Sequence, residues 1–182
     1  MFHKNILFEQ NIYTAPLSKT LDVNEEQVKE NILEGYQKQK LKKDLLSGPK
    51  DQYFNIKDQV HTKWIIDYLT DNFKLKYNKS LILINTFGLI QIKGQEISQH
   101  QHIDDYDIHG SPDMSVIFTV DTGEIPSFIE FEFSGGRKRN LFWREPFKKN
   151  QFIIFNSELR HRFSKNYNSD PTYNLAFNFQ II

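Results

Sequence analysis

Residues 129–133, Ile-Glu-Phe-Glu-Phe, alternate strictly between apolar and acidic side chains. Successive side chains of a β-strand project to opposite faces, so this period of two predicts a strand with one apolar and one polar face. Residues 175–179, Leu-Ala-Phe-Asn-Phe, repeat the pattern. Short β-type runs, separated by Gly, Pro, Asn and Asp, are predicted at 81–92, 96–103, 114–120, 128–133, 152–155, 160–163 and 173–181. Residues 81–182 therefore predict an all-β sandwich or barrel.

Turn sequences separate several of these runs. Asp121-Thr122-Gly123 and the pair Gly135-Gly136 both combine residues that tolerate tight backbone turns. The sequence therefore predicts hairpin connections at 121–123 and at 135–136.

The first third of the sequence instead has apolar residues at the spacing typical of helices. An apolar stripe at helical spacing follows a cap at Asn24 or Asp22, with acidic residues in its first turn and lysines towards its end at Lys43. A second stripe predicts a helix over about 62–73, which would brace a sheet. The apolar residues of 50–60 show no regular spacing, so this segment is expected to form a loop.

Length and composition are those of a globular protein. The chain has 182 residues, of which 38% are hydrophobic and 25% charged, enough to bury a core without disulfides or structural metal. We expect a single domain, 1–182, in which a helical N-terminal extension, 1–80, packs on a β core formed by 81–182.

The charge balance and the absence of cysteine exclude several kinds of function. Lys and Arg number 23, as do Asp and Glu, so no net field attracts phosphate backbones or anionic lipid, and nucleic acid is an unlikely partner. Without cysteine, a metal site must use His and carboxylate ligands. No signal peptide and no membrane span is recognisable, so a cytoplasmic protein without a membrane partner is expected.

The segment 99–105, Gln-His-Gln-His-Ile-Asp-Asp, is the most informative stretch for function. In an extended strand His100, His102 and Asp104 project from one face, and an antiparallel neighbour could bring His161 to them. Two imidazoles and one carboxylate on one side of a divalent metal leave its other side open, as in non-haem Fe(II) oxygenases. The predicted metal ligands are His100, His102, Asp104 and His161.

A solvated loop is the alternative interpretation of the same segment. His-x-His also occurs in exposed polar stretches, and Asp104, Asp105 and Asp107 fit a polar loop tip. Only Asp104 continues the alternation of the two histidines. The other histidines show no partner pattern and are expected at the surface: His3, His61 and His109.

Residues 84–179 resemble a family of 2-oxoglutarate- and Fe(II)-dependent oxygenases found in bacteria and phages. In that family a strand, a Lys-Gly turn, an H-x-H or H-x-D element and a distal Phe-x-Ser-x-Leu-x-His element follow in order. The corresponding segments here are Asn85-Thr86-Phe87, Lys93-Gly94, His100 to Asp104, Met114 to Phe118, Phe155 to His161 and Leu175 to Asn178. The resemblance implies a mostly β fold with N-terminal helices, a double-stranded β-helix or jelly roll, that binds Fe(II) near one open end and uses 2-oxoglutarate.

The sequence departs from the family pattern at the co-substrate site. The family has an Arg shortly before the last strand, which would bind the distal carboxylate of 2-oxoglutarate, and this position falls at about Thr172 or Tyr173 here. Arg160 and Arg162 flank His161, so strand alternation should point them away from the metal. Other candidate cations are Arg139, Arg144, Lys148 and Lys165.

Three functions remain open at this point. The first is an Fe(II)- and 2-oxoglutarate-dependent oxygenase (dioxygenase) that hydroxylates a C–H bond. Its ligand pair beside His161 is His100 and His102 by resemblance, or His102 and Asp104 by facial-triad chemistry. The second is a cupin-like metal enzyme with three histidine ligands and no 2-oxoglutarate. The third is a jelly-roll binding module without catalysis.

The substrate, a small molecule or a protein, is not identified by any motif. Loops set specificity in such barrels, and residues 104–113 and 134–150 are the expected loops. Phe87, Phe118 and Trp143 are candidates for pocket walls, although a core position is the simpler interpretation of each.

Overall fold

The computed structural model describes residues 12–16, 24–43, 53–55, 62–103, 106–134 and 140–182. The elements follow in the order β1 (Ile12–Pro16), α1 (Glu25–Lys43), β2 (Tyr53–Asn55), α2 (Lys63–Tyr77), β3 (Leu81–Gln91), β4 (Ile97–His100), β5 (Met114–Asp121), β6 (Phe128–Ser134), β7 (Asn140–Pro146), β8 (Gln151–Asn156), β9 (His161–Phe163) and β10 (Thr172–Ile181).

The described strands form two antiparallel sheets. The larger sheet contains six of them, in the order β1-β8-β5-β10-β3-β2, and the smaller sheet contains four, in the order β4-β9-β6-β7. From β3 onward the chain passes between the two sheets at every connection except the one between β6 and β7. This strand order is that of a jelly roll, so the double-stranded β-helix predicted above is confirmed.

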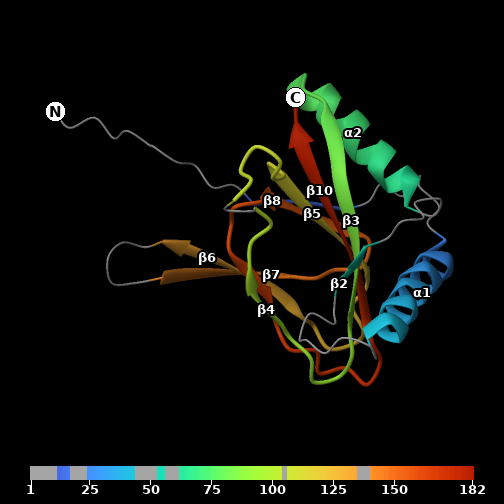
Figure 1. The fold of residues 1–182 in the computed structure, drawn as a ribbon. Helices are drawn as coiled ribbons and strands as arrows, with labels where there is room; N and C mark the ends of the chain where they lie inside the picture. Colours follow the sequence, from blue (N-terminus) through green and yellow to red (C-terminus); the bar gives the residue numbers. More distant parts are fainter. Residues whose placement is uncertain (1–11, 17–23, 44–52, 56–61, 104–105, 135–139) are drawn as a thin grey trace.

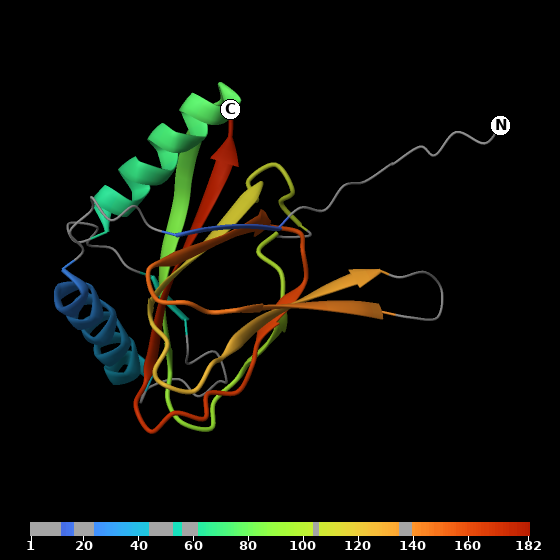
Figure 2. The same ribbon diagram turned by 180° about the vertical axis from the view of Figure 1, so that it is seen from behind.

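The larger sheet is buried on both faces. Its outer face packs against the two helices, and its inner face packs against the smaller sheet. Figures 1 and 2 show both helices on one side of the larger sheet and the β6–β7 hairpin extending on the opposite side. The outer core includes Ile32, Ile65, Phe118, Phe152 and Phe177, and the inner core includes Ile117, Phe131, Ile153, Phe155 and Phe163.

Both predicted helices are present. Asn24 caps α1, because its Oδ1 accepts a hydrogen bond of 3.2 Å from the backbone N–H of Gln27. Helix α2 begins after Thr62 and continues four residues past the predicted end, to Tyr77, where Asn78 adopts a left-handed conformation with φ of 53°. Within the described residues, no helix has the length and apolar character that a membrane crossing requires.

Three loop or turn predictions are wrong. The segment 50–60 contains β2, which pairs with β3 at the edge of the larger sheet. The segment 134–150 contains β7, which pairs with β6 along its whole length. The turn at 121–123 does not close a hairpin, because β5 belongs to the larger sheet and β6 to the smaller one.

Each error has a physical cause. Strands β2 and β7 lie at sheet edges, so neither needs the alternation that marks a strand with one buried face. The turn itself is present: the backbone N–H of Gly123 donates to the Asp121 side chain, and Gly123 has φ of 67°. A local turn signal does not say whether the next strand pairs with the last one or crosses to another sheet.

Candidate metal centre

The smaller sheet places His100 directly opposite His161. His100 is the last residue of β4 and His161 the first of β9, and the two are Cα partners in an antiparallel pair. Strand β4 ends at His100, before the predicted end at Ile103, so His102 lies beyond the strand. The backbone N–H of His102 donates to the Ser157 carbonyl at 2.9 Å, and this bond holds the residue against the turn before β9.

The three imidazoles converge. The ring centroids of His100 and His161 are 4.3 Å apart, and those of His102 and His161 are 4.9 Å apart. Potential ligand atoms of all three residues lie within 4.8 Å of one another. The Nε2 atoms of His100 and His102 are 3.3 Å apart. Two nitrogens that share a cation at about 2.1 Å would be separated by roughly 3 to 3.4 Å, so this distance suits a bound metal.

Each imidazole has a hydrogen-bond partner at Nδ1. His100 Nδ1 donates to the Ser98 carbonyl at 2.9 Å, and His161 Nδ1 donates to the Leu159 carbonyl at 2.8 Å. Because a carbonyl can only accept, both rings carry their hydrogen on Nδ1 when neutral, and Nε2 keeps its lone pair. His161 Nε2 is buried and has no hydrogen-bond partner. A metal ion would satisfy this orphaned nitrogen.

His102 is held by a buried polar network. Its Nδ1 lies 2.7 Å from both Asn178 Oδ1 and Ser115 Oγ. Ser115 Oγ donates to Asn178 Oδ1 and also contacts Ser157 Oγ, each at 2.8 Å. Asn178 Nδ2 donates to Asn85 Oδ1 at 2.8 Å, which orients the Asn178 oxygen towards His102. The network therefore favours the same Nδ1–H tautomer in His102.

Burial keeps the imidazoles neutral. It is the main cause that lowers the pKa of His100, and with the neighbouring His100 it lowers the pKa of His102 to about 4. Burial, followed by the proximity of His102 and His100, holds the pKa of His161 well below its usual value. Neutral imidazoles are the form that ligates metals, so at neutral pH the cluster is ready to bind a cation.

The structure describes three of the four predicted ligands. His100, His102 and His161 lie together as described, whereas Asp104 lies outside the described residues. Within the part of the chain that the structure describes, the cluster contains no carboxylate. The ligand set itself remains a prediction. His109 is exposed, as expected, and His3, His61 and Asp105 lie outside the described residues.

The nearby arginines point away from the cluster. Arg162 Nε pairs with Glu130 at 2.5 Å on the outer face of the smaller sheet, and Arg144 Nε pairs with the same carboxylate at 2.5 Å. Arg160 is exposed and lies 3.8 Å from Glu132. Strand alternation predicted this orientation for Arg160 and Arg162. Lys148 and Lys165 are exposed, and Arg139 lies outside the described residues.

Sequence reasoning missed the residues that orient His102. Ser115 and Asn178 are polar positions in strands whose other residues are mostly apolar, and both are almost completely buried. A polar residue in a buried strand needs a hydrogen-bond partner, so these two positions carried a usable signal. Thr172, at the expected position of the family Arg, is also buried, and its Oγ1 has no hydrogen-bond partner.

Of the three aromatic residues expected as possible pocket walls, two lie in or against the core and one is exposed. Phe118 belongs to the outer core and Phe87 packs against the inner core, which matches the simpler interpretation of both. Trp143 is exposed and lines a cavity between β1 and β7. Phe131 and Phe155 pack against His161, with ring centroids 6.1 Å and 4.8 Å from its own. These two rings exclude water from that side of the imidazole.

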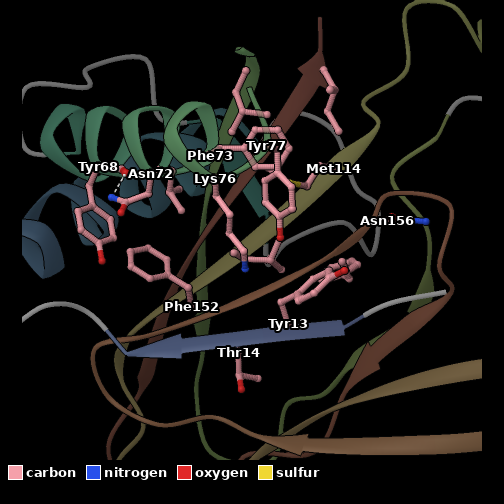
Figure 3. Close-up of a pocket in the computed structure, with 15 residues that line it drawn as sticks. Tyr13, Thr14, Tyr68, Asn72, Phe73, Lys76, Tyr77, Met114, Phe152 and Asn156 are labelled. Carbon is pink, nitrogen blue, oxygen red and sulfur yellow. Dashed lines mark hydrogen bonds between the residues drawn. The ribbon is translucent and has the colours of Figure 1, made fainter. Parts of the chain in front are cut away.

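A separate cavity of about 420 Å³ lies on the outer side of the larger sheet, between α2 and β1. Its lining includes Tyr68, Phe73, Lys76 and Phe152, and none of the three histidines. Figure 3 shows Tyr13 directed into this cavity and Thr14 directed to the other side of β1. Thr14 lines this cavity and also the one beside Trp143, so β1 borders both.

No protein-family profile matches this sequence, and no curated protein matches it. Solved structures do resemble it. An oxidoreductase of the 2OG-Fe(II) oxygenase family from Burkholderia pseudomallei is 10% identical, over 93% of this chain and 84% of that one, with a TM-score of 0.62. HygX from Streptomyces hygroscopicus, solved with nickel and 2-oxoglutarate, is 14% identical over 94% and 83%, with a TM-score of 0.62.

A prolyl-4-hydroxylase from Pseudomonas putida is 10% identical, over 94% of this chain and 88% of that one, with a TM-score of 0.58. At such identities the likeness establishes the fold. It agrees with the strand order described above, so the fold implied by the sequence resemblance is confirmed twice, by topology and by comparison.

Proposed function

We propose that this chain is an Fe(II)- and 2-oxoglutarate-dependent oxygenase that hydroxylates an organic substrate. The observation that carries the proposal is the convergence of His100, His102 and His161, each with Nδ1 hydrogen-bonded and Nε2 turned towards the others. His100 and His161 lie on β4 and β9 of a jelly roll, and His102 follows β4. The similar structure from Burkholderia pseudomallei is of a 2OG-Fe(II) oxygenase family member, and HygX was solved with nickel and 2-oxoglutarate bound.

The chain's own residues would hold and shield the metal. Three nitrogen ligands leave further coordination positions open for a co-substrate and oxygen. Fe(II) with 2-oxoglutarate supplies the oxygen-activating chemistry, which the protein itself lacks. The protein fixes the tautomers of the imidazoles through hydrogen bonds to Ser98, Leu159 and Asn178. Aromatic rings packed against His161 keep water away from that ligand.

Succinate formation from 2-oxoglutarate tests the proposal. The chain is purified without a His tag, loaded with Fe(II) under nitrogen, and exposed to air with 2-oxoglutarate. We expect metal-dependent succinate, and none from His161→Ala. Iron-loaded protein that forms no succinate, with or without a panel of substrates, would remove the proposal.

A second function is favoured by one specific observation. The expected co-substrate position, at about Thr172 or Tyr173, holds no cation, and Arg144, Arg160 and Arg162 lie on the outer face of the smaller sheet. This suits a three-histidine metal enzyme that does not use 2-oxoglutarate. Thermal unfolding of the Mn(II)-loaded protein with 2-oxoglutarate, or with N-oxalylglycine, separates the two functions, because a ligand that binds the folded state raises the Tm.

A binding module without catalysis is the third possibility. It predicts that protein purified without a tag contains no stoichiometric metal by elemental analysis and binds none added in solution.

We also infer that the proposed oxygenase acts in the cytoplasm on a small molecule or a protein. The zero net charge supports a partner other than nucleic acid.

A further inference from the structure

We infer that the substrate carries a guanidinium group, which binds between Trp143 and Glu145. This inference deepens the proposed oxygenase function and rests on it, because the site is defined by its position relative to the three histidines.

A row of paired residues leads from the histidines to Trp143. On the smaller sheet, His100 pairs with His161, His161 with Phe131, and Phe131 with Trp143. Directly paired residues project to the same face, so all four side chains lie on the inner face. Neighbouring strands are about 4.8 Å apart, and Trp143 is two strands from His161. The Cα atoms of these two residues are therefore about 10 Å apart. A substrate held at Trp143 is therefore close to the proposed metal.

The inner face is open at Trp143 and closed at Phe131. The Trp143 side chain is 57% exposed, whereas Phe131 is completely buried. A cavity of about 360 Å³ lies beside the indole, where the edge strand β1 meets the edge strand β7. It is lined by Ile12, Thr14, Phe133, Trp143 and Glu145. A large aromatic ring that is exposed on the face of the active centre is a surface that a ligand can cover.

The charge of this lining selects a cation. Glu145 is the charged residue among those that line the cavity, and its Oε2 accepts a hydrogen bond of 3.4 Å from Trp143 Nε1. The carboxylate is therefore held beside the indole ring. A planar guanidinium can stack on indole and donate two hydrogen bonds to a carboxylate, which a compact ammonium group cannot do.

The outer face of the smaller sheet has the opposite charge. Arg144 and Arg162 flank the buried Glu130 there, and the Arg162 guanidinium lies 5.7 Å from the ring centroid of Phe142. With Arg160 beside Glu132, this face carries three arginines and two carboxylates, which leaves an excess of one positive charge. A cationic substrate is repelled from the outer face of β7 and attracted to its inner face.

Calorimetric titration of the full chain tests this inference. The protein is loaded with Mn(II) and 2-oxoglutarate, and the probes are N-acetyl-L-arginine methylamide and its neutral isostere, N-acetyl-L-citrulline methylamide. We expect the arginine probe to bind roughly ten-fold more tightly than the citrulline probe. Equal affinities in the wild-type protein would overturn the inference, whatever the variants do.

Variants locate the binding site. Trp143→Ala and Glu145→Gln are each expected to weaken arginine binding about ten-fold, while Trp143→Phe retains most of it. Phe142→Ala is the matched control, because Phe142 is 54% exposed on the same strand but faces the other way. Equal weakening by Phe142→Ala and Trp143→Ala would overturn the inference. Circular dichroism melting curves verify that each variant folds.

The same preparations separate this inference from the proposed function. Succinate formation without a preference for the arginine probe overturns the guanidinium site and leaves the oxygenase. A preference for the arginine probe without succinate formation supports the site and overturns the oxygenase.

Discussion

Each histidine of the cluster is hydrogen-bonded through Nδ1 and offers Nε2 to the centre, and His102 Nδ1 lies within 2.7 Å of both Asn178 Oδ1 and Ser115 Oγ. The acceptors differ, since two are backbone carbonyls next to the ligand and one is the side chain of Asn178. A carbonyl acceptor cannot be removed by mutation, but an amide side chain can. At the residue scale, Asn178 is therefore the point where the orientation of an imidazole can be tested.

Substitution of Asn178 is expected to weaken metal binding without abolishing it. Asn178→Leu removes one of the two oxygens beside His102 Nδ1 and leaves only Ser115 Oγ to orient the ring, so affinity for Zn(II) or Fe(II) should fall about 10-fold. Asn178→Asp keeps an acceptor for His102 but loses the donor to Asn85, so it should bind metal more tightly than Asn178→Leu. Equal losses in both variants would show that packing, and not the hydrogen bond, matters.

Loss of a ligand should have a larger effect. His161→Ala removes the buried Nε2 and is expected to eliminate stoichiometric metal, measured by elemental analysis after dialysis against Fe(II) or Zn(II). His109→Ala is the matched control, because His109 is exposed and lies outside the cluster. Full metal content in His161→Ala would contradict the assignment of this residue as a ligand.

At the scale of elements, the smaller sheet is tied together by one acidic side chain. Glu130 on β6 lies in register with Arg144 on β7 and with Arg162 on β9, and it bonds to both. The Glu130 side chain is 6% exposed, whereas the two arginine side chains are 67% and 51% exposed. The carboxylate thus links the strand that carries His161 to the edge hairpin that carries Trp143.

Removal of Glu130 should cost more stability than removal of either arginine. Glu130→Ala leaves two arginines without a partner and is expected to lower the free energy of unfolding by about 2 kcal/mol. Arg144→Ala leaves the carboxylate paired with Arg162, so its cost should stay below about 1 kcal/mol, the value typical of exposed ion pairs. Urea denaturation of the metal-free variants measures both, and equal costs would contradict this assignment.

At the scale of the whole molecule, three neutral imidazoles packed together link folding to pH. The folded-state pKa of His102 is about 4, and those of His100 and His161 are also lowered, whereas an unfolded histidine has its ordinary value of 6.5. Below pH 6.5 the unfolded state binds more protons than the folded state. The stability that these residues contribute is therefore complete above pH 6.5 and is lost as the pH falls towards 4.

The metal-free protein should lose stability on acidification from pH 7.5 to pH 5. The loss expected from His102 alone is on the order of 2 kcal/mol, and His100 and His161 add to it. Urea denaturation at several pH values measures it. Glu25 and Asp121 have lowered pKa values and titrate below this window, so they do not account for the loss. His161→Asn should flatten the dependence and His109→Asn should not. An identical slope in all three proteins would contradict the assignment.

The sequence by itself determined most elements of the fold. The alternation at 129–133 and 175–179 predicted β6 and part of β10, and the apolar stripes predicted both helices, because these elements bury one face and their periods show it. It also gave the candidate ligands, which are His100, His102, Asp104 and His161. The edge strands β2 and β7 escaped prediction, since an edge strand needs no regular buried face.

The tertiary structure alone decided how distant residues meet. The polar positions Ser115 and Asn178 gained a role only when the larger sheet placed them beside His102. The registers of the smaller sheet placed Trp143 on the same face and row as His161. Strand pairing joins residues far apart in the chain through backbone hydrogen bonds that any sequence can make, so local pattern does not encode which strands become neighbours.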